Sequence, residues 1–390
     1  MPTYKDDAYS VEVARREARS KAYNYLEDAI ATQGFSSELS FDADFRTTFA
    51  LSSARDGIRR TMNVDIGFDA GEEAFSAMMA LKLLVRDGPS ARPTLVHRLA
   101  ATVTGSRRGG RFRMFPSWTD FAADTDCTSV AAASLYEAGR LPKGAFLRCA
   151  EQLLLSAADV DLPAEANVEP GDGATNGPLH RGVVMVYWED DREPGARRRG
   201  RKHDPAVALN ALYALKLAAH EGLRDPQGVI GQTMDFAAAH LLSGRYRQGT
   251  RYYPSPDTFL YFASCLCRRF PEVNRRLREP LTGALIERSR AARQPGGPAD
   301  PQSALNLAQR TLTAANLDVD LGTIRQQLAL TQEQAEDGSW PAAPLFSMGK
   351  RKIFFGSKPL TTVFALAALG DHRRDAEQER FSHGDAALAR

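Results

Sequence analysis

The sequence has 390 residues, of which 43% are hydrophobic, and its 50 Lys and Arg nearly balance its 48 Asp and Glu. The formal charge of +2 argues against a global attraction to nucleic acid or to an anionic membrane. The first residues are polar, and no stretch stays apolar for the ~20 residues of a membrane span. We therefore expect a cytoplasmic protein with no integral membrane segment. The four cysteines are expected to be reduced, because they lie in apolar helical patterns; they are Cys127, Cys149, Cys265 and Cys267.

Helical periodicity dominates the chain, and strand signals are scarce. The predicted helices span, in chain order, residues 11–31, 72–85, 94–103, 128–138, 143–157, 205–221, 227–242, 257–269, 273–291, 302–315, 323–336 and 360–369. Two segments rich in Gly, Pro and charge, 163–178 and 189–203, are expected to be long loops. We predict one all-α domain over residues 1–390, with a polar N-terminal extension over about 1–9 and a flexible tail over about 371–390.

A loop-to-helix device recurs along the chain: an aromatic residue and a turn precede polar N-cap residues and an Ala-rich, strongly apolar helix. Examples begin at Phe115-Pro116, Tyr253-Pro254 and Trp340-Pro341. Helices that are apolar all round are buried on every side, which suits the inner ring of a double-ring helical barrel. Their N-termini would meet at one mouth, where backbone N–H groups orient carboxylates or favour anions.

Several motifs resemble the class II terpene cyclases of the squalene-hopene cyclase type. The segment Gln334–Trp340 is similar to their Q-x-x-x-G-x-W repeat, and Asp124-Thr125-Asp126-Cys127 resembles their D-x-D-D acid motif. The helix start at Asp204-Pro205 and the segment from Gly356 to Thr362 are similar to further inner-helix starts of that family. The resemblance implies a single (α/α)6 barrel of about twelve helices, similar to the β domain of drimenyl-diphosphate-type cyclases.

The acid motif implies a reaction that begins with protonation of an alkene. Such an acid must stay protonated at neutral pH and still donate strongly, a demand that burial and a second carboxyl group help to meet. By resemblance, Asp126 is the proton donor and Asp124 tunes and orients it. Cys127 stands where the family has a third Asp or a Thr, and Thr128 is expected to supply a hydroxyl. The alternative is that both aspartates only cap a helix.

The resemblance further implies an aromatic cavity, because aromatic faces stabilise carbocations. The expected substrate-binding residues, for which core packing is the alternative, are Trp118, Tyr187, Trp188, Asn210, Tyr252, Tyr253, Phe259 and Phe355. Trp340 is expected to pack between helices. A retained diphosphate would be anchored by Arg247, Arg251 and Lys358. We expect Glu189 and Asp190 to hold Mg²⁺ near the diphosphate, and a solvated loop is the alternative.

The predicted activity is conversion of farnesyl diphosphate to a cyclic, drimane-type product with the diphosphate retained. The alternatives are a geranylgeranyl diphosphate or meroterpenoid cyclase, or a non-catalytic isoprenoid-binding barrel. We expect no organic cofactor and no nucleic-acid partner, and either a homodimer or a separate phosphatase acting on the product. The histidines are scattered, with no H-E-x-x-H spacing, so no zinc site of the kind that prenyltransferase barrels need is predicted.

Overall fold

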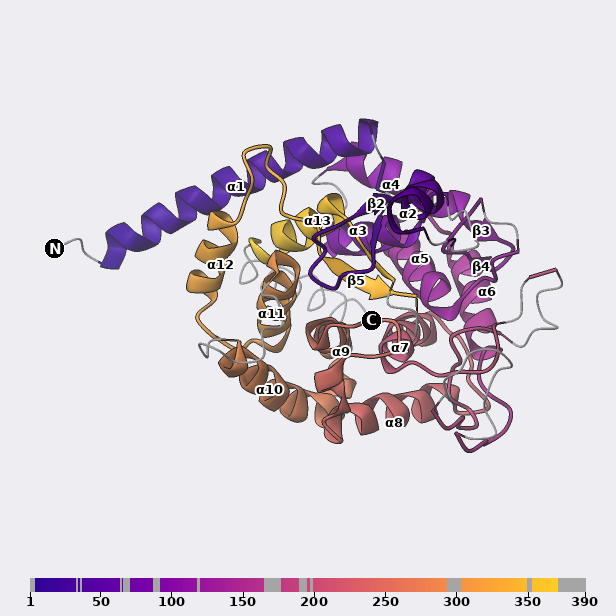
Figure 1. Cartoon of the computed structure of the whole chain (residues 1–390). Coiled ribbons are helices and arrows are strands. Elements are labelled where there is room, and N and C mark those ends of the chain that lie inside the picture. The colour runs from indigo at the N-terminus through magenta and orange to yellow at the C-terminus, as the bar shows by residue number, and fades with distance from the viewer. Residues whose placement is uncertain are drawn as a thin grey trace.

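Twelve α-helices form two concentric rings in the computed structural model, which confirms the predicted all-α barrel (Figure 1). The structure describes residues 4–32, 34–35, 37–63, 65, 71–86, 92–117, 120–164, 177–188, 195–196, 199–292, 303–348 and 353–370. The inner ring consists of α3 (Phe75–Arg86), α5 (Thr125–Glu137), α7 (Pro205–His220), α9 (Pro256–Arg269), α11 (Ala304–Leu317) and α13 (Lys358–Ala368). Each inner helix contacts the next, and α13 contacts α3, so the ring is closed.

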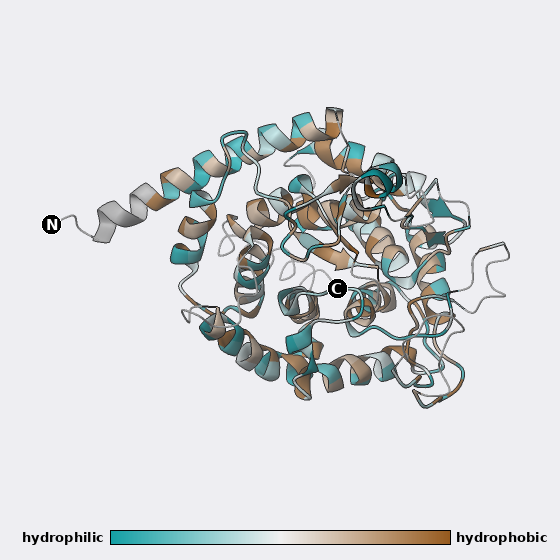
Figure 2. Cartoon of the chain, in the orientation of Figure 1, coloured by the Kyte–Doolittle hydropathy of each residue, from teal (hydrophilic) through white to brown (hydrophobic). Residues whose placement is uncertain are grey.

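The outer ring covers the inner one. It consists of α1 (Tyr4–Thr32), α4 (Pro93–Gly105), α6 (Lys143–Leu154), α8 (Val229–Leu242), α10 (Asn274–Ala291) and α12 (Thr323–Gln332). Hydrophilic and hydrophobic residues alternate along these helices (Figure 2), as expected where one face is solvated and the other packs on the inner ring. None of the helices in the described ranges has the length and hydropathy to cross a membrane.

Five of the six inner helices begin with a capping side chain, and all of these caps except Ser303 are buried. Ser255, Ser303 and Ser357 each accept a hydrogen bond from a backbone N–H in the first turn of α9, α11 and α13, and Asp124 and Asp204 do the same for α5 and α7. Capping satisfies N–H groups that would otherwise be buried without a partner. The predicted loop-to-helix device is therefore confirmed, and it aligns the N-termini of the inner ring at one end.

A small antiparallel sheet lies at this end and was not predicted from the sequence. Its strand order is β2 (Phe49–Ala50), β1 (Glu38–Ser40), β6 (Phe354–Gly356) and β5 (Pro344–Ser347). The Ser347 N–H donates to the Tyr252 carbonyl at 2.7 Å, which ties β5 to the segment before α9. We call this end of the barrel, bounded by the inner-helix N-termini and this sheet, the mouth.

Other differences from the predicted elements lie mostly outside the rings. Helix α1 begins at Tyr4 and not near residue 11, so residues 4–9 of the predicted N-terminal extension have helical backbone, and α1 projects beyond the ring (Figure 1). A short helix α2 (Ala54–Met62), a 3-10 helix η1 (Leu51–Ser53) and a hairpin of β3 (Arg107–Arg108) and β4 (Arg111–Phe112) were not predicted either. The 3-10 helices η3 (Arg245–Gln248) and η4 (Pro271–Val273) lie in turns. The predicted tail over 371–390 and most of the two predicted loops lie outside the described residues.

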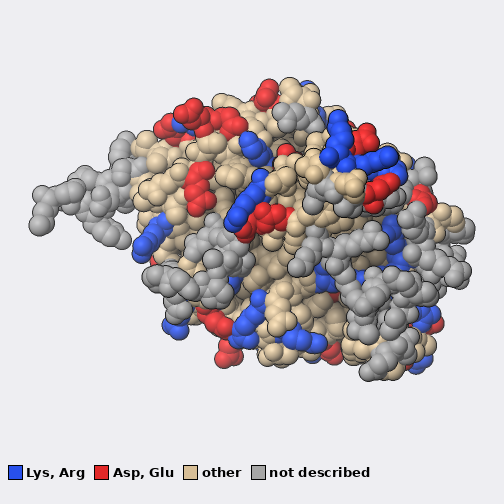
Figure 3. All heavy atoms as spheres, viewed as in Figure 1, with Lys and Arg blue, Asp and Glu red and all other residues tan. Residues whose placement is uncertain are grey.

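Trp340 packs as predicted, between helices. Its side chain is fully buried, its Nε1 donates to the Leu330 carbonyl of α12 at 2.8 Å, and its backbone N–H donates to Thr362 Oγ1 of α13 at 3.1 Å. On the face shown in Figure 3, Lys and Arg are interspersed with Asp and Glu, in keeping with the small net charge.

Candidate active site at the barrel mouth

Asp124 is the N-cap of α5. Its Oδ1 accepts a hydrogen bond from the Cys127 N–H at 2.6 Å, and its side chain is buried. The next residue anchors the turn, because the Thr125 N–H donates to the Val186 carbonyl at 2.9 Å and its hydroxyl donates to the Met185 carbonyl at 2.6 Å. The capping interpretation of the motif is therefore correct for Asp124.

The carboxyl group of Asp126 points away from its own helix, toward α7 and the segment before α9. Its Oδ1 accepts a hydrogen bond from Asn210 Nδ2 of α7 at 2.8 Å, and its Oδ2 accepts one from the Tyr253 hydroxyl, which precedes α9. The residue is only 8% exposed. A carboxyl group bonded to side chains of two neighbouring inner-ring segments is not a helix cap.

Burial determines the ionisation of this carboxyl group. The pKa of Asp126 is raised to about 7, chiefly by desolvation, and the negative charges of Asp124 and Asp204 contribute to the rise. The hydrogen bonds from Tyr253 and Asn210 act in the opposite direction, because they stabilise the carboxylate. Asp126 is thus a carboxylic acid that keeps its proton to near-neutral pH and has two donors ready for the anion.

Cys127 and Thr128, which follow Asp126 in the motif, are buried, and within the described part of the chain neither is hydrogen-bonded to the Asp126 carboxyl group. Burial and the charge of Asp124 raise the pKa of the Cys127 thiol well above its usual value, so the thiol stays neutral. The Thr128 hydroxyl oxygen accepts a hydrogen bond from the Phe112 N–H at 3.0 Å. Thr128 therefore holds β4 against α5, and the structure gives its hydroxyl this role in place of the expected contact with the acid.

Aromatic side chains surround the mouth beside Tyr253. The ring of Phe75 lies 6.4 Å from that of Tyr253 and 5.4 Å from that of Phe346, and Phe346 stacks on Phe355 at 5.1 Å. Phe262 of α9 meets Tyr253 edge to face at 5.2 Å. All five rings are buried. Such a wall is apolar and presents π faces, which is what a cation in a water-poor site requires.

Sequence reasoning identified Tyr253 and Phe355 in this wall but missed Phe75, Phe262 and Phe346. It also missed Phe115, whose ring lies 6.3 Å from that of Phe355. Phe115 lies in the loop that precedes α5, and Phe346 lies in β5, between Trp340-Pro341 and α13, so a search for every aromatic residue in the segments that lead to the inner helices would have found both. Phe75 and Phe262 lie within helices, where the sequence alone does not show which rings pack beside Tyr253.

Tyr187 and Tyr252 lie beside the caps of α5 and α7. The Tyr252 N–H donates to Asp204 Oδ2 at 3.2 Å, and its side chain is hydrogen-bonded to that of Tyr187. Burial raises the pKa of Tyr187 to about 12, so both phenols are neutral donors at physiological pH. The guanidinium of Arg251 lies 5.9 Å from the Tyr252 ring centroid, which places this predicted anion-binding residue at the mouth.

Two predicted aromatic residues pack elsewhere. Trp188 donates from Nε1 to the Gln152 carbonyl of outer helix α6 at 2.9 Å, and Phe259 packs edge to face on His240 of outer helix α8 at 5.0 Å. Both rings therefore face the outer ring of the barrel, as core residues do, in place of the expected position in the cavity.

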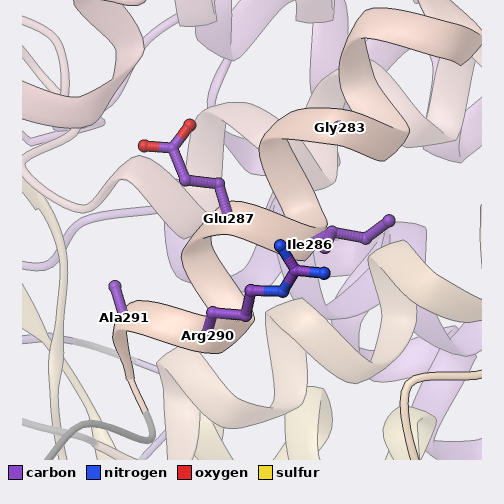
Figure 4. Close-up of a pocket in the computed structure, with 5 residues that line it drawn as sticks. All are labelled: Gly283, Ile286, Glu287, Arg290 and Ala291. Carbon is purple, nitrogen blue, oxygen red and sulfur yellow. The ribbon is translucent and has the colours of Figure 1, made fainter.

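Of the remaining predicted cations, Lys358 is exposed as the first residue of α13 at the mouth, whereas Arg247 is committed to a surface ion pair. The guanidinium of Arg247 makes two hydrogen bonds to Glu287 of α10, at 2.6 and 2.7 Å. Glu287 in turn lines a surface hollow on α10, away from the inner ring, with Gly283, Ile286, Arg290 and Ala291 (Figure 4). Trp118, Glu189 and Asp190 lie outside the described residues.

Comparisons with known proteins identify the fold. A variant of the type II terpene cyclase MstE of Scytonema, in complex with geranylgeranyl dihydroxybenzoate, aligns with 93% of this chain and 98% of its own at a TM-score of 0.58 and 11% identity. A protein from Actinoplanes aligns with 93% of this chain and 99% of its own, at a TM-score of 0.56 and 16% identity. The chain has the fold of the class II terpene cyclases.

The sequence also has a curated relative. A drimenol cyclase of Aspergillus calidoustus is 27% identical over 188 residues, which are 48% of this chain and 31% of that protein. The match thus spans about a third of the relative's own length. No protein-family model matches the sequence.

Proposed function

We propose that this protein is a class II terpene cyclase in which Asp126 protonates the terminal alkene of a linear isoprenoid. The observation that carries the proposal is the Asp126 carboxyl group, which is buried, protonated to near-neutral pH and hydrogen-bonded by Asn210 and Tyr253 beside an aromatic wall. The likeness to a drimenol cyclase and to MstE supports the same reaction class.

In the proposed first step, the proton leaves Asp126 and forms a C–H bond at the less substituted alkene carbon, so that the other alkene carbon becomes a tertiary cation. The negative charge left on Asp126 is stabilised by the Tyr253 hydroxyl and the Asn210 amide, which already point at the two carboxyl oxygens. The next double bond attacks the cation, and the faces of Phe75, Phe346 and Phe355 stabilise the charge as it moves. Loss of a proton or capture of water ends the sequence.

Asp124 has two tasks in this scheme. As the N-cap it fixes the first turn of α5 and therefore the direction of Asp126. Its negative charge also raises the pKa of Asp126, which keeps the donor protonated before substrate binds. Cys127 and Thr128 do not take part in proton transfer in this scheme, because one is a neutral thiol and the other binds a backbone N–H.

The proposed substrate is farnesyl diphosphate, and the proposed product is a drimane-type diphosphate. The drimenol cyclase relative supports this choice. Arg251 and Lys358 are the proposed diphosphate anchors, whereas Arg247 is held by Glu287. Mg²⁺ at Glu189 and Asp190, and a phosphatase that acts on the product, stay predictions. A meroterpenoid substrate is the second candidate, favoured by the likeness to MstE bound to geranylgeranyl dihydroxybenzoate.

The test is incubation of the full chain with farnesyl diphosphate, geranylgeranyl diphosphate and geranylgeranyl dihydroxybenzoate in parallel, with and without Mg²⁺. Products of the diphosphates are dephosphorylated and analysed by mass spectrometry. Cyclic products from the wild type, and none from Asp126→Asn, are expected. Binding of all three compounds without any cyclic product would show that the protein is an isoprenoid-binding barrel and not a cyclase. A cyclic product formed equally by Asp126→Asn would overturn the assignment of the acid.

A further inference from the structure

Lys82 is a cationic side chain that reaches across the ring of inner helices. It belongs to α3, and its Nζ donates to Asn210 Oδ1 of α7 at 3.2 Å. The same nitrogen lies 4.5 Å from the ring centroid of Tyr213 on α7 and 5.7 Å from that of Phe262 on α9. An amide oxygen and two aromatic faces thus fix the position of the nitrogen from two other inner helices.

The Asn210 amide lies between Lys82 and Asp126, and its two ends are not equivalent. The amide oxygen only accepts hydrogen bonds, and the amide nitrogen only donates them. Lysine has donors only, so the contact with Lys82 requires the oxygen, and the nitrogen is left to donate to Asp126 Oδ1 at 2.8 Å. If the amide were turned over, its NH₂ would face the lysine donor and its oxygen would face the carboxyl oxygen.

We propose that Lys82 is a positioning residue that fixes the orientation of the Asn210 amide and thereby places the acidic proton of Asp126 on Oδ2, beside Tyr253. Because Asn210 always donates to Oδ1, the Tyr253 hydroxyl is the partner that changes role: it accepts from the protonated acid and donates to the carboxylate. The consequence for cyclisation rests on the proposed function, whereas the effect on the ionisation of Asp126 does not.

Other charged and titratable groups also act on this site. Those that act on Asp126 or on the adjacent Cys127 are Asp124 at the start of the same helix, Glu73 before α3, Asp204 at the start of α7, and Tyr253 before α9. Lys82 additionally lowers the pKa of Glu137 at the end of α5, which accepts a hydrogen bond from the Tyr213 hydroxyl at 2.9 Å. All of these residues are retained in a Lys82 variant, and Glu137 is the one among them whose pKa Lys82 also lowers.

The test measures the pH at which Asp126 ionises in the full chain. It is read from the melting temperature of each variant against pH, compared with the same variant carrying Asp126→Asn. Lys82→Met keeps the side-chain stem and removes the donors, and we expect the pKa of Asp126 to rise by about 1 to 2 units, since one charge-assisted hydrogen bond loses its orientation. Lys216→Met is the matched control, because Lys216 is a poorly exposed lysine of α7 that pairs with Glu272 outside the ring.

A double-mutant cycle decides whether Lys82 acts through the amide. In an Asn210→Ala background, Lys82→Met is expected to produce little further change. An Asp126 pKa that is unchanged in Lys82→Met, or a shift of equal size with and without Asn210, would overturn the proposal. If Lys82→Met does not fold, Lys82→Gln takes its place; it retains an N–H donor without the charge, and a pKa midway between wild type and Asn210→Ala is expected.

The catalytic consequence has its own readout. With a substrate that the wild type cyclises, Lys82→Met is expected to lower kcat about 10- to 100-fold, to leave KM nearly unchanged and to move the alkaline limb of the kcat profile, where Asp126 loses its proton, to higher pH. If the wild type forms no cyclic product but the Asp126 pKa still shifts, the proposed function fails and the positioning role of Lys82 holds. If the wild type forms cyclic products and Lys82→Met changes neither kcat nor its pH profile, the positioning role of Lys82 is wrong and the proposed function stands.

Discussion

Replacing Asp126 with Asn should stabilise the protein at alkaline pH, because the buried acid makes folding depend on pH. The pKa of Asp126 is about 7 in the folded protein, against an ordinary value of 3.8. Below pH 3.8 the carboxyl group is protonated in both the folded and the unfolded protein, and its contribution to the free energy of unfolding is fully present. Between these values only the folded state holds the proton, so stability falls as pH rises toward 7. The shift of about three pKa units corresponds to about 4 kcal/mol.

The assay is thermal unfolding of wild type and Asp126→Asn from pH 4.5 to 8.5. Asn preserves the size of the side chain and still accepts from Asn210, but it cannot ionise. For a chain of 390 residues, about 4 kcal/mol corresponds to roughly 5 °C in melting temperature. The two proteins should therefore melt nearly together at pH 4.5 and differ by roughly 5 °C, with Asn higher, at pH 8. Melting curves that stay parallel over this range would refute the argument that burial keeps Asp126 protonated.

Three further predictions concern Tyr253, Cys127 and the buried carboxylate of Asp257 on α9, which is paired with Arg288 and Arg310. Tyr253→Phe removes the donor to the Asp126 carboxylate, so the pKa of Asp126 should rise by about one unit or more, and cyclisation should slow about 10- to 100-fold; unchanged kinetics in a pH–rate profile would contradict this role. Cys127→Ser should keep activity, and thiol alkylation of the folded wild type should not inactivate it, since a buried neutral thiol is a poor nucleophile. Asp257→Asn removes the charge that pairs with Arg288 and Arg310, and should cost about 3 to 5 kcal/mol in urea denaturation, whereas a loss below ~1 kcal/mol would show that the buried network is not needed.

The ring architecture could be predicted because the inner helices carry a local and redundant signal. An Ala-rich helix that is apolar on all sides, preceded by a capping residue, can only be buried between other helices. The sheet at the mouth could not be predicted, because its strands have two to four residues each and pair segments as distant as Leu39 and Phe355. Helix α2 was missed because its signal is weak: four of its nine residues are charged, and among its described side chains only Ala54 and Ile58 are buried.

The candidate site was predicted where residues lie near one another in sequence and missed where they meet across the ring. Asn210 and Tyr253 were both expected to touch substrate, but each donates to Asp126 from a different segment. Phe259 was expected in the cavity as one of the aromatic residues near the mouth, with core packing as the alternative, and its ring packs on His240 of the outer ring. Phe259 and Phe262 are less than one helical turn apart on α9, yet Phe259 packs on the outer ring and Phe262 packs on Tyr253. In a helix that is apolar on every side, the sequence pattern does not distinguish the two directions.

The two aspartates of the motif show how the same residue type acquires two roles within one helical turn. Asp124 precedes the first helical residue, so its carboxylate meets an N–H group of its own helix. Asp126 lies two residues later, within the helix, where the side chain points outward from the axis and meets α7 and the segment before α9. Capping stabilises a negative charge, whereas desolvation in the ring opposes one. The charge of the cap adds to desolvation in holding the neighbouring acid in its neutral form, so the acid role of Asp126 depends in part on the capping role of Asp124.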